Sequence, residues 1–356
     1  MRLDVAGDNL IERIAVLTGL LPAPLVQVSF GNGYARAIVA GVRLGVYEAI
    51  APGEWVDAAT LAERTGCHPV GIEVLANALV GFDTLRRKDG RYALAASARR
   101  WLRRDAKMEM VDAVDFLGHC LDLTVRLEDD VRTGDIVRLH DRKLSPEFWD
   151  AYMKALATFT KLGAPEVKRK LKKAGALRRG GQPIERVLDV GGGHGRWAAA
   201  LCDSVDGLQG EVLDMPAACR VGRAILKDVP GGDRVTHREG DFRDGSWGQG
   251  YDLILVFRVL HNATEEEARG LMDSAMQAVR PGGWLAVLDA AHPGRPGGDL
   301  DASAGYNELF FFVISGARAW PEHAMSRWMK DAGFVGTKTS RLLAAPEVLL
   351  LGQRPD

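Results

Sequence analysis

A cluster of glycines is the feature of the sequence that most clearly points to ligand binding. Residues 187–198 read VLDVGGGHGRWA, so an apolar run is followed by glycine at positions 191, 192, 193 and 195 and then by a helix-like segment. Glycine allows a tight backbone turn and lets a ligand approach the chain where a Cβ would block it. A plain turn does not need four glycines, because each loses much conformational entropy on folding. We therefore expect this loop to bind a ligand.

Acidic residues at the ends of the next two expected strands indicate a nucleoside. Asp214 follows Gly191 by 23 residues and ends the expected strand 210–216. Its carboxylate can accept both hydrogen bonds of a ribose diol. Gly240-Asp241-Phe242 ends the expected strand 233–242, where a carboxylate and an aromatic ring suit the edge and the face of adenine. The spacing Gly193-x-Gly195-x-x-Ala198 also fits the dinucleotide fingerprint, so a nicotinamide oxidoreductase stays an alternative.

His261 is a candidate general base. It follows the most apolar expected strand, 251–260, at the end of the sheet where ligands bind. A free histidine has a pKa of about 6.5, so at neutral pH it can accept a proton. Taken alone, a single histidine after a strand is more often structural than catalytic.

The second half of the chain alternates between strand-like and helix-like segments. This pattern predicts an α/β fold, a Rossmann-like doubly wound sheet with helices on both faces, closed by an antiparallel hairpin strand at the C-terminus. Thr264 and Glu267 indicate a capping box at the start of a helix that ends at Pro281-Gly282-Gly283. The expected strands are 185–190, 210–216, 233–242, 251–260, 284–290, 335–343 and 347–354.

The first part reads as mainly helical. Segments 33–50, 57–66 and 68–83 have helical patterns, and 84–94 contains the hairpin turn Lys88-Asp89-Gly90. Helix, short helix, helix and β-wing together are typical of a winged-helix domain. Residues 105–135 and 146–173 read as further helices, and glycines and a proline loosen the chain near 174–186. The expected organisation is a winged-helix dimerisation domain at 1–105, a helical connector at 106–180 and a cofactor-binding domain at 181–356.

Composition limits the classes of function. The 356 residues carry a net charge of −1, which argues against a surface built for nucleic acid or anionic lipid. The expected wing does hold Arg86, Arg87, Lys88 and Arg91, so a DNA-binding regulator that senses a nucleoside is kept as an alternative. No long apolar run predicts a membrane span, and the first residues lack the apolar core of a secretory signal, so a cytoplasmic protein is expected. The four cysteines and the histidines show no metal-ligand spacing, and no metal is expected.

Five segments in order, VLDVGGGHG, LDMP, GDF, VLHN and RPGG, resemble the class I S-adenosylmethionine-dependent methyltransferases. Together with the winged-helix pattern, they more narrowly resemble the small-molecule O-methyltransferases of plants and of bacterial secondary metabolism, including antibiotic biosynthesis. The resemblance covers nearly the whole chain. It implies S-adenosyl-L-methionine as cofactor, a homodimer formed through the N-terminal domain, and a small aromatic acceptor with no nucleic-acid or membrane partner.

The resemblance also implies roles for individual residues. Glycines 191, 193 and 195 would approach the methionine part of the cofactor, and Asp189 would shape their loop. Asp214, followed by Met215, would hold the ribose, Asp241 and Phe242 would hold the adenine, and Arg258 would supply a basic group near the cofactor. His261 would be the base and Asp289 would orient it, although a carboxylate at a strand end also serves to cap a loop. The implied acceptor walls between the domains are Trp149, Tyr152, Met153, Asn307, Phe310 and Phe311.

The sequence departs from the family pattern near the expected base. The family reads His-Asp-Trp where this chain has His261-Asn262-Ala263. The segment Gly316-Ala317-Arg318-Ala319-Trp320 stands where the family has Gly-x-Glu-Arg-Thr, with alanine in place of the supporting glutamate. An already acidic phenol, a nitrogen or a carbon acceptor, and a reaction other than methyl transfer, are therefore alternatives.

Overall fold

The computed structural model describes residues 7, 9–136, 145–294, 301–343 and 345–356. The chain divides into two compact units, residues 1–122 and 123–356. The three-part division that the sequence suggests, with boundaries near residues 105 and 180, stays a prediction. Among the described helices, none combines the length and apolar character needed to cross a bilayer.

Unit 1 has the helices and the small hairpin expected of a winged helix. Asp57 caps the third helix by accepting the Thr60 N–H at 2.8 Å, and Gly66 ends it in the left-handed conformation. Asp89 and Gly90 both have positive φ, at 48° and 74°, as a two-residue hairpin turn requires. The elements are α1 (Leu10–Leu17), α2 (Ala23–Arg43), α3 (Ala58–Thr65), α4 (Pro69–Gly81), β1 (Leu85–Lys88), β2 (Arg91–Leu94), α5 (Ala96–Trp101) and α6 (Val111–Leu123).

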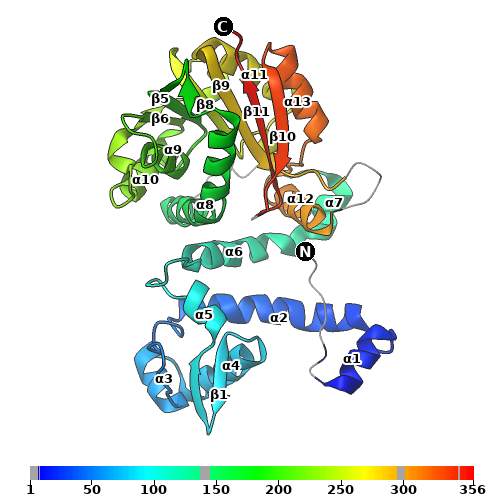
Figure 1. Ribbon diagram of the computed structural model, residues 1–356. Coiled ribbons are helices and arrows are strands. Elements are labelled where there is room, and N and C mark those ends of the chain that lie inside the picture. Colours follow the sequence, from blue (N-terminus) through cyan, green and yellow to red (C-terminus); the bar gives the residue numbers. More distant parts are fainter. Residues whose placement is uncertain (1–6, 8, 137–144, 295–300, 344) are drawn as a thin grey trace. The chain divides into compact units, whose positions relative to one another are not determined.

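Unit 2 contains a seven-stranded sheet in the order β10-β11-β9-β8-β5-β6-β7 (Figure 1). The pairs among β5 to β9 are parallel, whereas β11 runs antiparallel to β9 and to β10. The expected doubly wound sheet with a C-terminal antiparallel strand is thus confirmed. Its strands are β5 (Arg186–Val190), β6 (Gln209–Asp214), β7 (Val235–Glu239), β8 (Tyr251–Phe257), β9 (Val279–Ala290), β10 (Val335–Arg341) and β11 (Glu347–Gln353).

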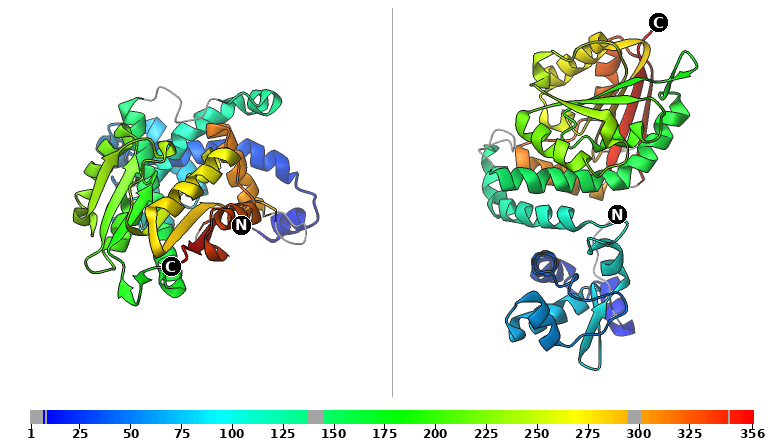
Figure 2. Two further views of the ribbon diagram at one scale, coloured as in Figure 1. Left: turned by 90° about the horizontal axis from the view of Figure 1, so that it is seen from above. Right: turned by 90° about the vertical axis from the view of Figure 1, so that its left-hand side faces the viewer.

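Helices cover both faces of this sheet (Figures 1 and 2). Alternate residues of a strand point to opposite faces, and the two cores follow this rule. Leu253 and Leu255 of β8 pack with α8 and α9, while Ile254 and Val256 pack with α11 and α13. The helices of unit 2 are α7 (Leu127–Thr133), α8 (Pro146–Ala174), α9 (Arg196–Cys202), α10 (Pro216–Leu226), α11 (Glu265–Ala278), α12 (Ala302–Ser315) and α13 (Glu322–Asp331), and a two-residue pair, β3 (Arg178–Arg179) and β4 (Gln182–Pro183), follows α8.

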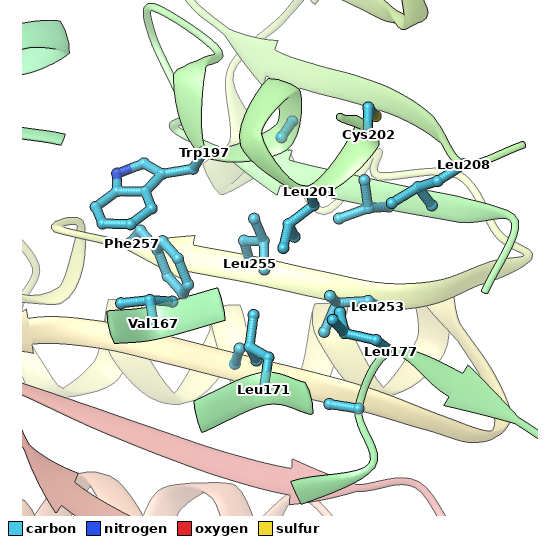
Figure 3. Packing of buried hydrophobic residues seen from close by; sticks show 14 of the residues in the cluster. Val167, Leu171, Leu177, Trp197, Leu201, Cys202, Leu208, Leu253, Leu255 and Phe257 are labelled. Atoms are coloured by element: carbon cyan, nitrogen blue, oxygen red, sulfur yellow. The ribbon is translucent and has the colours of Figure 1, made fainter. Parts of the chain in front are cut away.

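Figure 3 shows the core between α8, α9 and the sheet, and α9 begins directly after the glycine loop. Trp197 of α9 meets Phe257 at the end of β8 edge to face, with ring centroids 5.1 Å apart. Val167 and Leu171 of α8 pack into the same cluster. Because Trp197 follows the loop by two residues and Phe257 precedes the segment of His261, this packing fixes both segments at one edge of the sheet.

The helix expected to end at Pro-Gly-Gly ends earlier. Helix α11 stops at Ala278, and Pro281-Gly282-Gly283 lies inside β9. The pairing of β8 with β9 shifts register between Tyr251 and Leu253, and Gly282 has a φ of 70° there. The glycines therefore allow the irregular backbone at the start of β9. Backbone hydrogen bonds of Gly282 and Gly283 with Arg354 hold this segment in place.

Candidate active site

The glycine loop connects β5 to α9 and needs its glycines for geometric reasons. Gly191, Gly193 and Gly195 have φ of 65°, 47° and 68°, a region that residues with a Cβ rarely adopt. A Cβ at Gly191 would lie 2.8 Å from Val259 Cγ2, and one at Gly193 would lie 3.0 Å from Met153 Sδ. The loop is thus a cradle in which no Cβ atoms stand between the backbone and the neighbouring side chains.

Asp189 lies under this cradle with its carboxylate pressed against Gly192. A Cβ on Gly192 would come within 2.4 Å of the Asp189 carboxyl carbon. The side chain is fully buried, and neither oxygen makes a hydrogen bond of normal geometry with a described residue. Burial, with a smaller contribution from Asp214, raises the pKa of Asp189 to about 7.

Asp214 at the end of β6 faces the same loop. Its Oδ2 accepts the Gly193 N–H at 2.8 Å, and its Oδ1 accepts the N–H of the half-exposed Met215 at 2.6 Å. Burial raises the pKa of Asp214 to about 6, against the effect of these two hydrogen bonds. Each carboxylate oxygen keeps a further lone pair with which it can accept a hydroxyl.

Asp241 and Phe242 follow β7, on the other side of the loop. Phe242 begins the short 3-10 helix η4 (Phe242–Asp244), and its ring edge would be 3.3 Å from a Cβ at Gly191. Asp241 accepts hydrogen bonds from the Arg243 guanidinium at 2.6 to 3.1 Å, which lowers the pKa of Asp241. The sequence reading missed Arg243, which engages the carboxylate expected to contact adenine.

His261 and Asp289 form a buried pair. The Asp289 carboxylate lies 2.8 Å from His261 Nδ1 and also accepts the His261 and Ala290 backbone N–H groups, at 3.2 and 2.7 Å. Both side chains are almost fully buried, and the Phe311 ring stacks on the imidazole with centroids 4.3 Å apart. Because a carboxylate only accepts hydrogen bonds, Nδ1 carries the proton and Nε2 keeps a lone pair. The orienting contact that the resemblance implies for Asp289 is present.

Arg258 adopts an unusual backbone conformation directly after β8. Its φ is 60°, and its N–H donates to the Leu288 carbonyl at 2.6 Å. The guanidinium donates through Nε to the buried Glu347 at 2.5 Å. Glu347 is 89 residues away in the sequence, and no motif singled it out.

A second histidine, His194, is buried within the glycine loop. Its Nδ1 accepts the Arg196 N–H at 3.0 Å, so Nε2 carries the hydrogen and donates to Thr160 Oγ1 at 3.3 Å. Thr160 in turn donates to the Leu156 carbonyl at 3.0 Å. Burial, assisted by nearby Arg258, lowers the pKa of His194 to about 3, so this residue stays neutral and ties the loop to α8.

The residues expected to wall the acceptor site fall into two groups. Trp149 and Met153 of α8 are buried against α10, with Tyr152 half-buried beside them, and Met153 Sδ lies next to Gly193. Phe311 of α12 reaches His261, and Phe310 meets Phe311 at 5.9 Å between centroids. Asn307 is half-buried on the same helix. The first group therefore lies beside the glycine loop, and the second lies beside the candidate base.

A pocket of about 180 Å³ opens beside His261. Ala317 and Ala319 are buried near it, whereas Arg318 is exposed. Ser315 donates to Asn262 Oδ1 at 3.0 Å across the pocket, and Trp320 Nε1 donates to the Leu260 carbonyl at 2.9 Å. Its lining consists of His261, Asn262, Ala263, Thr264, Ser315, Gly316, Ala317, Arg318 and Trp320. Among the described residues, no group of His, Cys, Asp and Glu is arranged to hold a metal ion.

Comparisons with known proteins identify the family and the fold of the chain. The model of the O-methyltransferase domain family matches residues 138–335, and that of the O-methyltransferase dimerisation domain matches residues 26–104. A 3-hydroxy-5-methyl-1-naphthoate 3-O-methyltransferase of Streptomyces sahachiroi is 24% identical over 90% of this chain and 91% of its own length. An aclacinomycin 10-hydroxylase of Streptomyces purpurascens is 34% identical over 33% of this chain and 31% of its own length. The fold is that of human N-acetylserotonin methyltransferase, solved in complex with S-adenosylmethionine, with a TM-score of 0.80 at 17% identity over 99% of this chain and 100% of that one.

Proposed function

Since the chain belongs to the S-adenosylmethionine-dependent O-methyltransferase family, we propose that it methylates a hydroxyl of an aromatic or polyketide-like small molecule with His261 as general base. The observation that carries this proposal is the buried pair of His261 and Asp289 at 2.8 Å. This pairing leaves His261 Nε2 as the proton acceptor, at the edge of the sheet where the glycine loop and Asp214 also lie.

The residues present fit the cofactor. S-adenosylmethionine, when bound, supplies a methyl carbon on a sulfonium and leaves as S-adenosylhomocysteine. The glycine loop would receive its methionine part, with the buried carboxylate of Asp189 supporting the loop from below. Asp214 would accept the ribose hydroxyls through its remaining lone pairs, and Asp241 with Phe242 would hold the adenine. Two carboxylates facing the loop also suit a ligand that carries positive charge.

The chemistry of the chain's own residues is proton removal and alignment. His261 Nε2 would take the proton of the acceptor hydroxyl, and the oxygen so freed would take up the methyl group that the cofactor supplies, with S-adenosylhomocysteine as the leaving group. Asp289 stabilises the imidazolium that results and holds the ring in the correct tautomer. A positioned base contributes about 10²–10⁴-fold, and alignment of the reacting groups contributes roughly 7–11 kcal/mol more.

We assign the acceptor walls to the aromatic side chains of both groups described above. Phe310, Phe311 and Asn307 of α12 lie beside the base, and a flat aromatic ring packs well against such side chains. Trp149, Tyr152 and Met153 of α8 lie beside the loop that would hold the methionine part. The name of the S. sahachiroi relative describes an aromatic acceptor with a ring hydroxyl, which supports the same class here.

The proposed assembly is a homodimer through the N-terminal unit. The dimerisation-domain match begins at residue 26, inside α2. Helices α1 and α2 expose large apolar side chains, with Leu17 85% and Val28 78% exposed. Such a surface is unusual for a monomer and suits a second copy of the chain.

A second candidate function is a reaction on the same cofactor site other than O-methylation. Two observations favour it: the alanines at 317 and 319 in place of an acidic support, and the similarity of part of the chain to a hydroxylase. Methylation adds one methyl group to the acceptor and releases S-adenosylhomocysteine, whereas hydroxylation adds oxygen. Product mass therefore separates the two functions.

The test is an assay of S-adenosylhomocysteine release against phenolic and polyketide compounds, with product mass measured in parallel. We expect methylated product from the wild type and a rate about 100-fold lower from His261→Ala. Full activity of His261→Ala at every pH would contradict the base assignment. Binding of neither S-adenosylmethionine nor S-adenosylhomocysteine in calorimetry would contradict the function as a whole.

A further inference from the structure

Resting on the proposed function, we infer that the acceptor carries a carboxylate, which Arg318 binds in the pocket beside His261. The proposal specifies the substrate class as a hydroxylated aromatic acid. It depends on three properties of the pocket, namely its size, its charge and its position next to the base.

The pocket has room for a single substituted ring. Its volume is about 180 Å³, and an engineered protein cavity of about 150 Å³ is known to take benzene. Trp320 and the segment from Ser315 to Arg318 contribute to its lining. Because His261 also lines the pocket, a ligand in it is next to the candidate base.

The charge of the lining favours an anion. Arg318 is the lining residue with a permanent charge, and the lining includes no Asp or Glu. In the part of the chain that the structure describes, Arg318 forms no ion pair, and the side-chain amide nitrogen of Asn262 donates to no residue. Asp289 is engaged by three hydrogen bonds behind the histidine. The positive charge of Arg318 is therefore available to a ligand.

The chemistry of the two side chains points to a carboxylate. A guanidinium presents two parallel N–H groups that match the two oxygens of a carboxylate. An amide N–H₂ group, as on Asn262, adds a neutral donor to the same kind of acceptor. Because no acidic side chain lines the pocket, the charge of Arg318 is not compensated there.

The test compares aromatic hydroxy acids with their neutral esters. The probes are 2-, 3- and 4-hydroxybenzoate, the corresponding methyl esters, and sodium acetate as a free carboxylate. Each is titrated by calorimetry into the full-length protein, with and without saturating S-adenosylhomocysteine. We expect the best acid to bind about fivefold more tightly than its ester, and Arg318→Gln to remove this difference while leaving the affinity for the ester unchanged.

Matched variants separate a specific contact from a general charge effect. Arg318→Lys keeps the positive charge but lacks the two parallel N–H groups of a guanidinium, so it should retain only part of the preference for acids over esters. Arg327→Gln removes an exposed arginine of α13 that does not line the pocket, and it should leave the preference intact. The melting temperature of each variant establishes that it is folded.

Several results would overturn the inference. These are equal binding of acids and esters, an unchanged preference in Arg318→Gln, no binding of any of the three acids to the wild type, or acetate binding as tightly as the aromatic acids. Absence of S-adenosylhomocysteine binding would instead contradict the proposed function. The titrations of acids and esters into the protein without S-adenosylhomocysteine would still show whether Arg318 binds a carboxylate.

Discussion

Replacing Asp289 by asparagine tests the proposed base most directly, because it removes the negative charge beside His261 while keeping the shape of the site. The Asp289 carboxylate accepts hydrogen bonds from His261 Nδ1, the His261 N–H and the Ala290 N–H. Asparagine has one acceptor oxygen and one donor nitrogen, so it cannot serve all three. Oδ2 accepts the His261 N–H, whereas Oδ1 accepts both Nδ1–H and the Ala290 N–H. An amide oxygen at the Oδ2 position places the amide nitrogen against Nδ1, so the imidazole proton moves to Nε2 and the lone pair that would accept the acceptor's proton is lost. An amide oxygen at the Oδ1 position keeps the tautomer, but the imidazolium formed on proton transfer then loses the negative charge that stabilises it.

The expected loss is about 100-fold in kcat, the lower end of what a general base contributes. This corresponds to about 2.7 kcal/mol of transition-state stabilisation, at 1.36 kcal/mol for each tenfold change. Affinity for the cofactor should stay within about twofold, because no described contact links Asp289 to the glycine loop or to Asp214. The effect should therefore fall on kcat and leave cofactor binding unchanged.

The assay measures initial rates of S-adenosylhomocysteine formation at saturating cofactor and acceptor, from pH 6 to pH 9. Asp331→Asn, at an exposed ion pair with Arg269, is the matched control and should keep wild-type rates. Asp289→Asn and His261→Ala combined should be no slower than His261→Ala alone, because the two residues act as one unit. If Asp289→Asn is folded and keeps its kcat within twofold at every pH while His261→Ala does not, the orienting role is refuted.

The remaining predictions concern the cofactor loop and the dimer. Burial raises the pKa of Asp189 to about 7 and that of Asp214 to about 6. Both carboxyl groups therefore stabilise the folded, cofactor-free protein fully at acidic pH, below the ordinary carboxyl pKa. This stabilisation is lost as the pH rises through 6 to 7. Binding of the cationic cofactor should release protons and tighten over the same range, and a calorimetric proton count of zero would contradict this. Gly193→Ala should cost about 1–2 kcal/mol of folding free energy and weaken cofactor binding, because the φ of this residue is 47° and the new Cβ would lie 3.0 Å from Met153 Sδ. An unchanged free energy of unfolding and an unchanged affinity for the cofactor would show that the loop relaxes freely. Leu17→Glu and Val28→Glu together should yield monomers in analytical ultracentrifugation, and persistence of the dimer would place the interface elsewhere.

The parts of the fold that the sequence predicted depend on local rules. The strands of the sheet alternate their side chains between two cores, and the Asp57 and Thr264 caps are made by residues close in the chain. The Pro-Gly-Gly segment was misread as a helix end, because the same residues also serve an irregular strand. The choice between the two depends on pairing with β8 and on Arg354, which a local pattern does not contain.

The sequence predicted the positions of Asp214 and His261, because each follows a strand that ends at the same edge of the sheet; their chemical roles stay predictions. The residues that were missed act through contacts between distant segments. Glu347 meets Arg258 across 89 positions, and His194 meets Thr160 across 34. Arg243 lies only two positions from Asp241, but a basic residue in a polar turn gives no signal of its own. The pocket beside His261 arises from small side chains, whose effect appears only when two segments pack together.

The hydrogen-bonded chain from Arg196 through His194 to Thr160 has a thermodynamic consequence for how two ligands meet. It joins the loop that would cradle one ligand to the helix whose earlier turns carry Trp149 and Met153. A ligand that repositions the loop must act on that helix through the shared histidine, and the converse must hold to the same degree. Occupancy of one site would then set the affinity of the other by a reciprocal factor, whichever ligand binds first.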